Sequence, residues 1–402
     1  MRIGQECGHY LFYQNITIES MKVLHICDSF SPLSETFIYD YITELERQGI
    51  DNHVLTFTRI NETDRPFDKV HVAKIKEDFI WFILRVIAEF NNKPNKFWAM
   101  QRREIKRIVK MVEPDIIHAH FGPMGVLVAP IAKKSKLPLV VTFYGYDASS
   151  LLKEEFWLKE YERLWSIVNG VTVLSKHMKD VLINIGCPEN KISIIHLSRK
   201  LDDISIKNIP NEIKNFISIG RLTEKKGHSD TIIAIKKVLD KGYKIKLKII
   251  GEGPLKEHLQ KMIIDNKLQE DVKLLGAVKN EETLNQLYKS DAFILCSKTA
   301  ENGDQEGTPT VLVEAQAIGL PCVSTCHAGI PEMVPEENKR FLAEEGNIEQ
   351  IKDCIIRLIN TDKSGLVKVV ERGRKKVEQE FNLEIEVEKI INLYKGSTLN
   401  AK

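Results

Sequence analysis

Short apolar runs alternate with amphipathic segments along most of the chain. The first half predicts a helix at 36–48 and buried β-strands at 22–28, 52–57, 116–120, 138–142 and 170–174. The second half predicts helices at 229–239, 255–264, 280–288 and 309–318, and strands at 216–219, 245–250, 272–275, 292–296 and 321–324. Continuous apolar strands that alternate with helices are typical of parallel sheets covered on both faces.

These units are too many for one sheet, so the pattern predicts an α/β fold of two doubly wound domains in series. The first domain is expected to span 21–200 and the second 210–378, with the boundary in the polar stretch 198–215. Residues 1–20 precede a second methionine, Met21, and are predicted to be an extension outside the fold. In such folds ligands bind at the carboxyl ends of strands and in clefts between domains.

Composition narrows the class of protein. The 402 residues are 43% hydrophobic and 28% charged, which is enough to bury a core, and the net charge of +2 argues against nucleic-acid binding. The seven cysteines show no paired spacing, which predicts reduced thiols and a cytoplasmic location. No signal peptide is recognised, and no apolar run approaches the ~18 residues of a membrane span.

Region 79–112 departs from the alternation. It begins with the aromatic run FIWFILRVIAEF and continues with basic helical sequence. Region 79–112 as a whole has eight Lys and Arg residues and only two acidic ones, Glu89 and Glu104. Aromatic apolar surface beside basic helices suits an anionic membrane surface. A core helix followed by a solvated charged face explains the same pattern, and both interpretations stay open.

The stretch 301–332 places two carboxylates around a predicted helix start. Thr308 and Pro309 are typical of an N-cap and a first helical residue, and Gly319 of a helix end. Free N–H groups at a helix start bind phosphate, and a carboxylate can accept both hydroxyls of a vicinal diol. Glu306 and Glu314 could therefore hold a sugar and a ribose on either side of a diphosphate, or they could be two solvated acids.

Two glycine-containing turns follow predicted strands. Gly220 and Arg221 come directly after 216–219, and Lys226 lies five residues further on, so two cations share one sheet edge. Together they would stabilise a departing diphosphate. The second turn, Gly-Glu-Gly-Pro at 251–254, lacks the third glycine of a dinucleotide fingerprint. It permits close backbone approach, for instance to a nucleobase, or is simply a tight turn.

The segments GRLTEKKG, IIGEGPL, LGAV and EGTPTVLVEAQAIGLPCVSTCHAGIPE occur in this order. With them the chain resembles the retaining GT-B glycosyltransferases of family GT4 over residues 21–395, most specifically over 215–335. Glu306 and Glu314 match the E-x7-E pattern of that family. The sequence GDQEG at 303–307 is most similar to the exopolysaccharide branch, which includes colanic-acid and amylovoran transferases.

The resemblance implies a GT-B architecture of two Rossmann-like domains facing a cleft, and a donor site without metal or cofactor. Arg221 and Lys226 would bind the diphosphate, Glu314 the ribose and Glu306 the donor sugar. Further donor-binding residues implied are Gly220, Gly251, Gly253, Pro254, Val278, Gly307, Thr308, Pro309 and Thr310. Retention is expected through a front-face reaction in which the leaving phosphate takes the acceptor proton, without an enzyme nucleophile.

Two histidines at a predicted strand end, His118 and His120, point to the same face. Such a pair could bind metal if further ligands joined it, or could be buried and hydrogen-bonded; the resemblance makes His120 a catalytic residue near the acceptor. The sequence VTFYGYD at 141–147 matches the T-x-H-G-x-D pattern of the family except that Tyr144 replaces the histidine. Tyrosine is a poor base near neutral pH, so a histidine-dependent role is not carried over. Gly145 and Asp147 match, and the resemblance implies that Tyr144, Gly145 and Asp147 help to bind the acceptor.

The resemblance implies that the first domain, 21–200, binds the acceptor and the second, 210–378, binds the nucleotide-sugar donor. Three further expectations concern the first domain. Ser34, Glu35 and Thr36 could cap the following helix, and the resemblance implies a role for them in binding the acceptor. The run 196–198 lacks the glycine that relatives often carry near the hinge. The final helix, about 381–395, is implied to pack back on the first domain.

The implied function is transfer of a hexose from a UDP- or GDP-sugar to a saccharide, expected to be lipid-linked, in exopolysaccharide, capsule or O-antigen biosynthesis. Region 79–112 would then contact the inner membrane surface, making the enzyme peripheral. Two alternatives stay open: a sugar-nucleotide epimerase of the same fold, and a non-catalytic sugar-nucleotide binding subunit. Acceptor-dependent release of nucleoside diphosphate separates the three.

Overall fold

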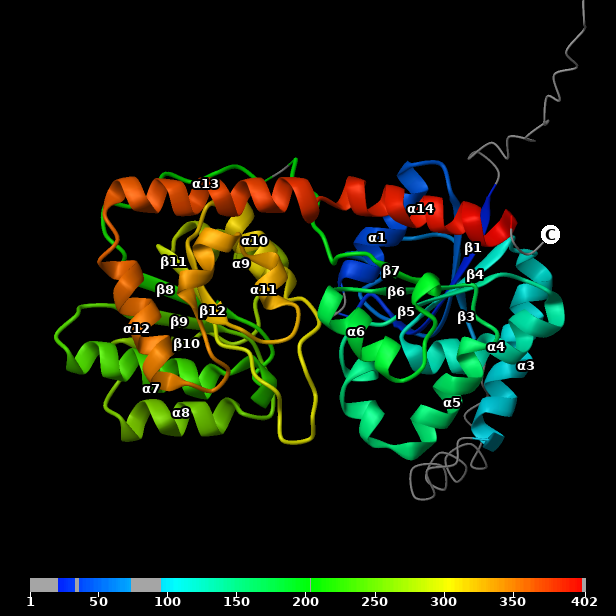
Figure 1. The fold of residues 1–402 in the computed structure, drawn as a ribbon, viewed down its shortest axis with the longest axis horizontal. Helices are drawn as coiled ribbons and strands as arrows, with labels where there is room; N and C mark the ends of the chain where they lie inside the picture. Colours follow the sequence, from blue (N-terminus) through cyan, green and yellow to red (C-terminus); the bar gives the residue numbers. More distant parts are fainter. Residues whose placement is uncertain (1–20, 33–35, 74–94, 203, 400–402) are drawn as a thin grey trace, which may run out of the picture.

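The computed structural model describes residues 21–32, 36–73, 95–202 and 204–399 (Figure 1). They form two α/β halves that lie side by side, each built on a parallel sheet. The chain passes between the halves twice, once after the last strand of the first sheet and once between the last two helices.

The first sheet has the strand order β3-β2-β1-β4-β5-β6-β7. Its strands are β1 (Lys22–Phe30), β2 (Asp51–Arg59), β3 (Val70–Val72), β4 (Ile116–His120), β5 (Leu139–Thr142), β6 (Gly170–Val173) and β7 (Ile192–Ile194). All residues of β4, β5 and β6 are buried, because helices cover both faces of the sheet at these central strands.

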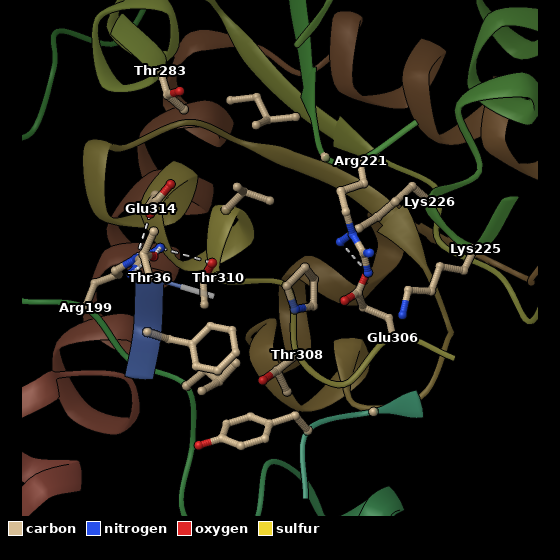
Figure 2. A pocket seen from close by; sticks show the side chains of 18 of the residues that line it. Thr36, Arg199, Arg221, Lys225, Lys226, Thr283, Glu306, Thr308, Thr310 and Glu314 are labelled. Atoms are coloured by element: carbon tan, nitrogen blue, oxygen red, sulfur yellow. Dashed lines mark hydrogen bonds and ion pairs between the residues drawn. The ribbon is translucent and has the colours of Figure 1, made fainter. Parts of the chain in front are cut away.

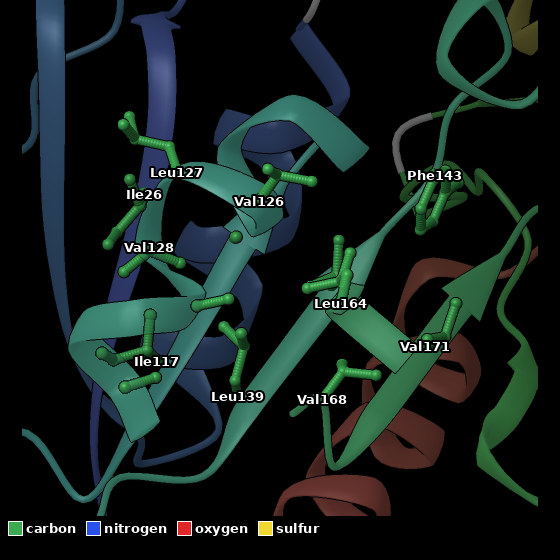
Figure 3. Close-up of a cluster of buried hydrophobic side chains, with 14 of the residues drawn as sticks. Ile26, Ile117, Val126, Leu127, Val128, Leu139, Phe143, Leu164, Val168 and Val171 are labelled. Atoms are coloured by element: carbon green, nitrogen blue, oxygen red, sulfur yellow. The ribbon is translucent and has the colours of Figure 1, made fainter. Parts of the chain in front are cut away.

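Alternate residues of these strands face different helix layers. Ile117 packs in the larger cluster with helices α3 (Asn95–Val112), α4 (Gly122–Ser135), α5 (Glu155–Trp165) and α6 (Lys176–Asn184) (Figure 3). Ile116 instead packs in a second cluster with α1 (Thr36–Arg47) and the C-terminal helix α14 (Leu383–Leu399). Two-residue alternation thus distributes apolar side chains to both sides of one sheet.

The second sheet has the order β10-β9-β8-β11-β12-β13. Its strands are β8 (Asn215–Ile219), β9 (Lys246–Ile250), β10 (Val272–Leu274), β11 (Ala292–Leu295), β12 (Cys322–Thr325) and β13 (Leu342–Ala343). One face carries α7 (His228–Asp240), α8 (Lys256–Asp265) and α12 (Ile348–Ile359). The other carries α9 (Asn280–Tyr288), α10 (Thr310–Ile318), α11 (Ile330–Met333) and α13 (Lys363–Glu380).

Both sheets reverse their strand order beside the first strand of each half, β1 and β8. Such switch points open a crevice at the carboxyl ends of the strands, where ligands bind in doubly wound folds. The predicted fold class is confirmed, and each predicted strand is found. The strands that the sequence pattern missed are β3, β7 and β13, which have three, three and two residues at sheet edges and are too short to show a pattern.

The expected terminal helix, 381–395, is α14, which begins at Leu383 and lies against the first half (Figure 1). Its Tyr394 hydroxyl is 2.6 Å from His118 Nδ1 in β4. The predicted extension 1–20 and the aromatic part of region 79–112, up to residue 94, lie outside the described residues.

Candidate active site

A cavity of about 440 Å³ lies between the two halves, at the carboxyl end of β8 (Figure 2). Its lining from the first half and the connecting segment consists of Thr36, Phe37, Arg65, Phe121, Tyr144, Gly145, Tyr146, Leu197 and Arg199. The second half contributes Ile219, Gly220, Arg221, Lys225, Lys226, Val278, Thr283, Glu306, Thr308, Pro309, Thr310, Val311 and Glu314. Most of the predicted donor residues therefore meet in one cavity.

Glu306 and Lys226 form an ion pair at this cavity, with only 12% and 11% of their side chains exposed. Burial opposes ionisation of Glu306, but the charges of Lys226 and then Lys225 outweigh it and hold the pKa of Glu306 below its usual value. The Lys225 Nζ atom donates to Asp304 Oδ1 at 3.0 Å and to the Gln305 carbonyl at 3.2 Å. Lys225 thus braces the loop that carries Glu306.

Arg221 is an exposed cation at the same cavity, next to Lys226 (Figure 2). Its guanidinium forms no ion pair with any residue that the structure describes. A positive group with no local counter-charge at a sheet edge is available to an anionic ligand.

Helix α10 begins at Thr310, so the predicted start is wrong by one residue. Pro309, not Thr308, occupies the N-cap position, because its ψ of 109° is extended and the helical conformation starts only after it. Among the residues that the structure describes, no side chain caps the first turn, and the buried Thr308 hydroxyl has no hydrogen-bond partner. This uncapped helix start lines the cavity and can receive a phosphate. Gly319 ends the helix with a φ of 91°, as predicted.

Three predicted donor residues, Gly251, Gly253 and Pro254, do not line the cavity. A Cβ atom on Gly251 would lie 1.9 Å from the Gly220 carbonyl oxygen, and one on Gly253 would lie 2.6 Å from the Leu222 oxygen. These glycines let two loops of the second half pack together, which supports the tight-turn interpretation over approach to a nucleobase.

Gly307 also lies outside the cavity lining, since its backbone faces the first half. A Cβ atom there would be 2.2 Å from the Tyr144 carbonyl oxygen. The absence of a side chain at Gly307 therefore allows the loop that carries Glu306 to touch the Tyr144–Gly145 turn.

His327 was not among the predicted site residues, although it belongs to the quoted HAGIPE segment. Its Nε2 accepts the Glu306 backbone N–H at 3.0 Å, and its Nδ1 donates to Glu345 Oε2 at 2.8 Å. The Glu345 carboxylate thus fixes the tautomer, and the ring holds the backbone of Glu306.

His120 is fully buried behind Tyr144 and does not line the cavity, in contrast to the predicted position near the acceptor. A hydrogen-bonded chain explains its place. The Asn52 amide NH2 donates to Glu46 Oε2, so its Oδ1 accepts from His25 Nε2–H at 3.0 Å. The free His25 Nδ1 accepts from His120 Nε2–H at 3.1 Å, and His120 Nδ1 accepts the Tyr144 hydroxyl proton at 2.6 Å.

His25 and His120, the two histidines of this hydrogen-bonded chain, are neutral near pH 7. Burial lowers the pKa of His25 to about 4 and that of His120 well below its usual value. These hydrogen bonds therefore fix Tyr144 as a donor toward the protein interior. They also hold its ring at the cavity. The alternative of a buried, hydrogen-bonded histidine fits His120.

His25 is a third histidine beside the pair His118 and His120. The possible ligand atoms of the three residues lie within 4.8 Å of one another. The two ring nitrogens of His118 are 2.6 Å from the hydroxyls of Tyr394 and Thr142. Since every ring nitrogen of the three has a hydrogen-bond partner, the cluster is satisfied as a polar network. The expectation that the enzyme needs no metal stays a prediction.

Asp147 is buried, and its side chain is hydrogen-bonded to backbone N–H groups. Its carboxylate accepts the N–H groups of Tyr144, Gly145 and Gly122, each at 2.9 Å. It shapes the Tyr144 turn and does not line the cavity. Of the predicted acceptor residues at the start of α1, Thr36 lines the cavity, whereas Ser34 and Glu35 lie outside the described residues.

Comparison with known proteins identifies the family. Residues 200–376 match the model for "Glycosyl transferases group 1", and 34–199 match "Glycosyltransferase Family 4". The chain is 32% identical to the putative colanic acid biosynthesis glycosyltransferase WcaL of Escherichia coli (strain K12), over 71% of this chain and 70% of WcaL. The chain belongs to glycosyltransferase family 4. This glycosyltransferase is also 35% identical to the amylovoran biosynthesis glycosyltransferase AmsK of Erwinia amylovora, over 67% of each chain.

Solved structures identify the fold of this glycosyltransferase as GT-B. Sucrose-phosphate synthase from Thermosynechococcus elongatus superposes with a TM-score of 0.73 at 15% identity, covering 94% of this chain and 98% of that one. Anabaena HepE, solved in complex with UDP-glucose, gives 0.73 at 18% identity, covering 93% and 98%. The relatives favour glycosyl transfer over the epimerase and binding-subunit alternatives. Among the described residues of the glycosyltransferase, no helix is long and apolar enough to cross a membrane.

Proposed function

We propose that this glycosyltransferase moves a hexose, with retention and without a metal ion, from a UDP- or GDP-sugar to a saccharide acceptor. The acceptor is a lipid-linked saccharide of exopolysaccharide, capsule or O-antigen biosynthesis, in keeping with the named roles of WcaL and AmsK. The observation that carries the proposal is a cavity lined by both halves, in which Arg221 and Lys226 lie at the uncapped start of α10 and Arg221 has no ion-pair partner among the described residues.

These groups match the charge that develops during transfer. When the bond between the sugar C1 and the diphosphate oxygen breaks, the leaving group gains negative charge. Arg221 offers planar paired donors, Lys226 offers a compact charge, and the N–H groups of α10 add a partial positive charge. Fixed positive groups of this kind stabilise the departing diphosphate more than the ground state.

The reaction balances without an enzyme nucleophile. The acceptor oxygen bonds to C1 on the face that the diphosphate leaves, and the acceptor proton passes to the departing phosphate oxygen. The Glu306 carboxylate is paired with Lys226, which reduces its nucleophilicity and suits it to hold hydroxyls of the donor sugar. The three positive groups supply the charge that a divalent cation would otherwise provide.

Thermal stabilisation tests the donor site without knowledge of the acceptor. We expect UDP- or GDP-hexoses, in the presence of EDTA, to raise the melting temperature, with about 2.7 kcal/mol of stabilisation at a hundredfold excess over Kd. Arg221→Ala should lose most of this shift, whereas Arg372→Ala, an exposed arginine on α13, should keep it. Equal shifts in all three proteins, or a shift abolished by EDTA, would contradict the site or its metal independence.

With the binding donor and an alkyl glycoside acceptor, NMR should show that the product keeps the anomeric configuration of the donor.

Contact with the inner membrane surface is part of the proposal. The described part of region 79–112 is α3, whose exposed residues include Arg103, Lys106, Arg107 and Lys110. Each basic residue near an anionic bilayer contributes about 1 kcal/mol, so Lys106→Glu/Lys110→Glu should weaken binding to phosphatidylglycerol vesicles by at least ~30-fold in a sedimentation assay. The same changes at Lys236 and Lys237 on α7 are the control. Unchanged binding by the α3 variant would refute membrane contact through this helix.

A further inference from the structure

Arg199 was not predicted as a site residue, yet its guanidinium contacts more groups at the cavity than that of Arg221. Its Nε lies 2.6 Å from Glu314 Oε1, and its Nη1 donates to Asp40 Oδ2 at 2.8 Å. Nη2 donates to the Thr310 hydroxyl at 3.2 Å, and both Nη atoms lie 3.4 Å from the Thr36 hydroxyl. Figure 2 shows the Arg199 guanidinium beside the side chains of Glu314, Thr36 and Thr310.

The contacts of Arg199 join the two halves of the enzyme. Asp40 and Thr36 belong to α1 of the first half, whereas Thr310 and Glu314 belong to α10 of the second. The backbone of Arg199 is fixed as well: its N–H donates to the Phe381 carbonyl, and its carbonyl accepts from Leu383 N–H, each at 3.1 Å. Arg199 therefore lies where the two interdomain crossings of the chain meet.

Charge explains why an arginine is needed here. The side chains of Arg199 and Glu314 are 13% and 5% exposed, so the carboxylate of Glu314 would be costly to bury without this counter-charge. A guanidinium offers five donors in a rigid fork and can serve two carboxylates and two hydroxyls together, which a lysine ammonium cannot. A carboxylate has about four acceptor sites, so Glu314 keeps capacity for a ligand diol beside Arg199.

We propose that Arg199 is a positioning residue for the nucleotide: it orients Glu314 toward the ribose hydroxyls and ties this site to α1 through Asp40. The inference rests on the proposed role of Glu314 in binding ribose. It adds that ribose recognition depends on a residue of the interdomain connection. The nucleotide site would then be coupled to the half that is expected to bind the acceptor.

The decisive measurement compares a nucleoside diphosphate with its 2′,3′-dideoxy form by isothermal titration calorimetry, using UDP or GDP, whichever binds more tightly. The ratio of the two dissociation constants reports the hydroxyls alone. Hydrogen bonds to a charged group predict that the wild type prefers the ribose form by about 10–100-fold. Arg199→Met and Glu314→Gln should each reduce this ratio toward one, and the double variant should reduce it no further. Asp40→Asn should reduce it in part.

Arg374→Met is the matched control, because Arg374 is 15% exposed and braces α10 through the Ala317 carbonyl without lining the cavity. It should lower stability and leave the ratio unchanged. If Arg199→Met does not fold, Arg199→Lys keeps the charge, loses the fork and should give an intermediate ratio. If the Arg199 variants keep the wild-type ratio while Glu314→Gln reduces it, the positioning role of Arg199 is wrong and the ribose role of Glu314 stands. No preference for ribose in the wild type would overturn the ribose role of Glu314 itself.

Discussion

Replacing Lys226 with methionine is expected to reduce kcat by ~10²–10³-fold, as loss of one fixed group that stabilises transition-state charge does in other enzymes. Lys226 lies in the cavity beside the start of α10, where the diphosphate is proposed to leave. Because its charge matters most when the sugar–phosphate bond breaks, kcat should fall more than KM for the donor rises. Steady-state release of nucleoside diphosphate measures both constants.

Lys236→Met is the control for this variant, since Lys236 pairs with Asp240 on the surface of α7 and its replacement should leave kcat unchanged.

The Lys226 variant should also change the pH dependence of the reaction, through the pKa of Glu306. Without Lys226 the burial of Glu306 is less opposed, so its pKa rises and the acid limb of the kcat/KM profile should move to higher pH. A kcat within tenfold of the wild type would contradict the proposed role of Lys226.

Gly227→Ala is expected to destabilise the second half by about 4 kcal/mol or more, in the range typical of severe backbone or core disruption. Gly227 has a φ of 62°, and a Cβ atom there would lie 1.7 Å from the Cys296 carbonyl oxygen. The turn would have to move away from β11 and carry Lys226, the preceding residue, with it. Urea unfolding followed by circular dichroism measures the stability, and the donor-induced melting shift should also be lost.

Gly242→Ala separates the two causes. Gly242 also has a positive φ, 88°, but no atom of the described part of the chain lies within 4 Å of a Cβ atom built on it. This variant should lose only the ~1–2 kcal/mol of a left-handed conformation for an L-residue. Equal losses in the two variants would show that contact with Cys296 is not what requires glycine at position 227.

Residue types at turns allowed many of the residues that meet in the cavity to be predicted. Arg221 and Lys226 follow the Gly220 turn after β8, and Glu306 and Glu314 flank the start of α10, so their common location follows from the rule that parallel strands end at one edge. For the turn at 251–254 the same kind of signal left two interpretations open, approach to a nucleobase or a tight turn. Whether a glycine turn faces a ligand or another loop depends on its neighbour, here the backbone of Gly220, which no local pattern records.

The sequence by itself determined the alternation of strands and helices, the two doubly wound sheets and the residue types of the loops that line the cavity, because each follows from periodicity and residue type over short distances. The tertiary structure alone decided the roles of Arg199, His327 and His120. Arg199 meets Glu314 only where the connecting segment passes α10, and His327 reaches Glu306 only after β12 has joined the sheet. His120 does not line the cavity, because it donates a hydrogen bond to the His25 side chain on neighbouring β1 and Tyr144 covers it. Partners brought together from distant parts of the chain determine which polar side chains face a ligand and which hold another residue in place.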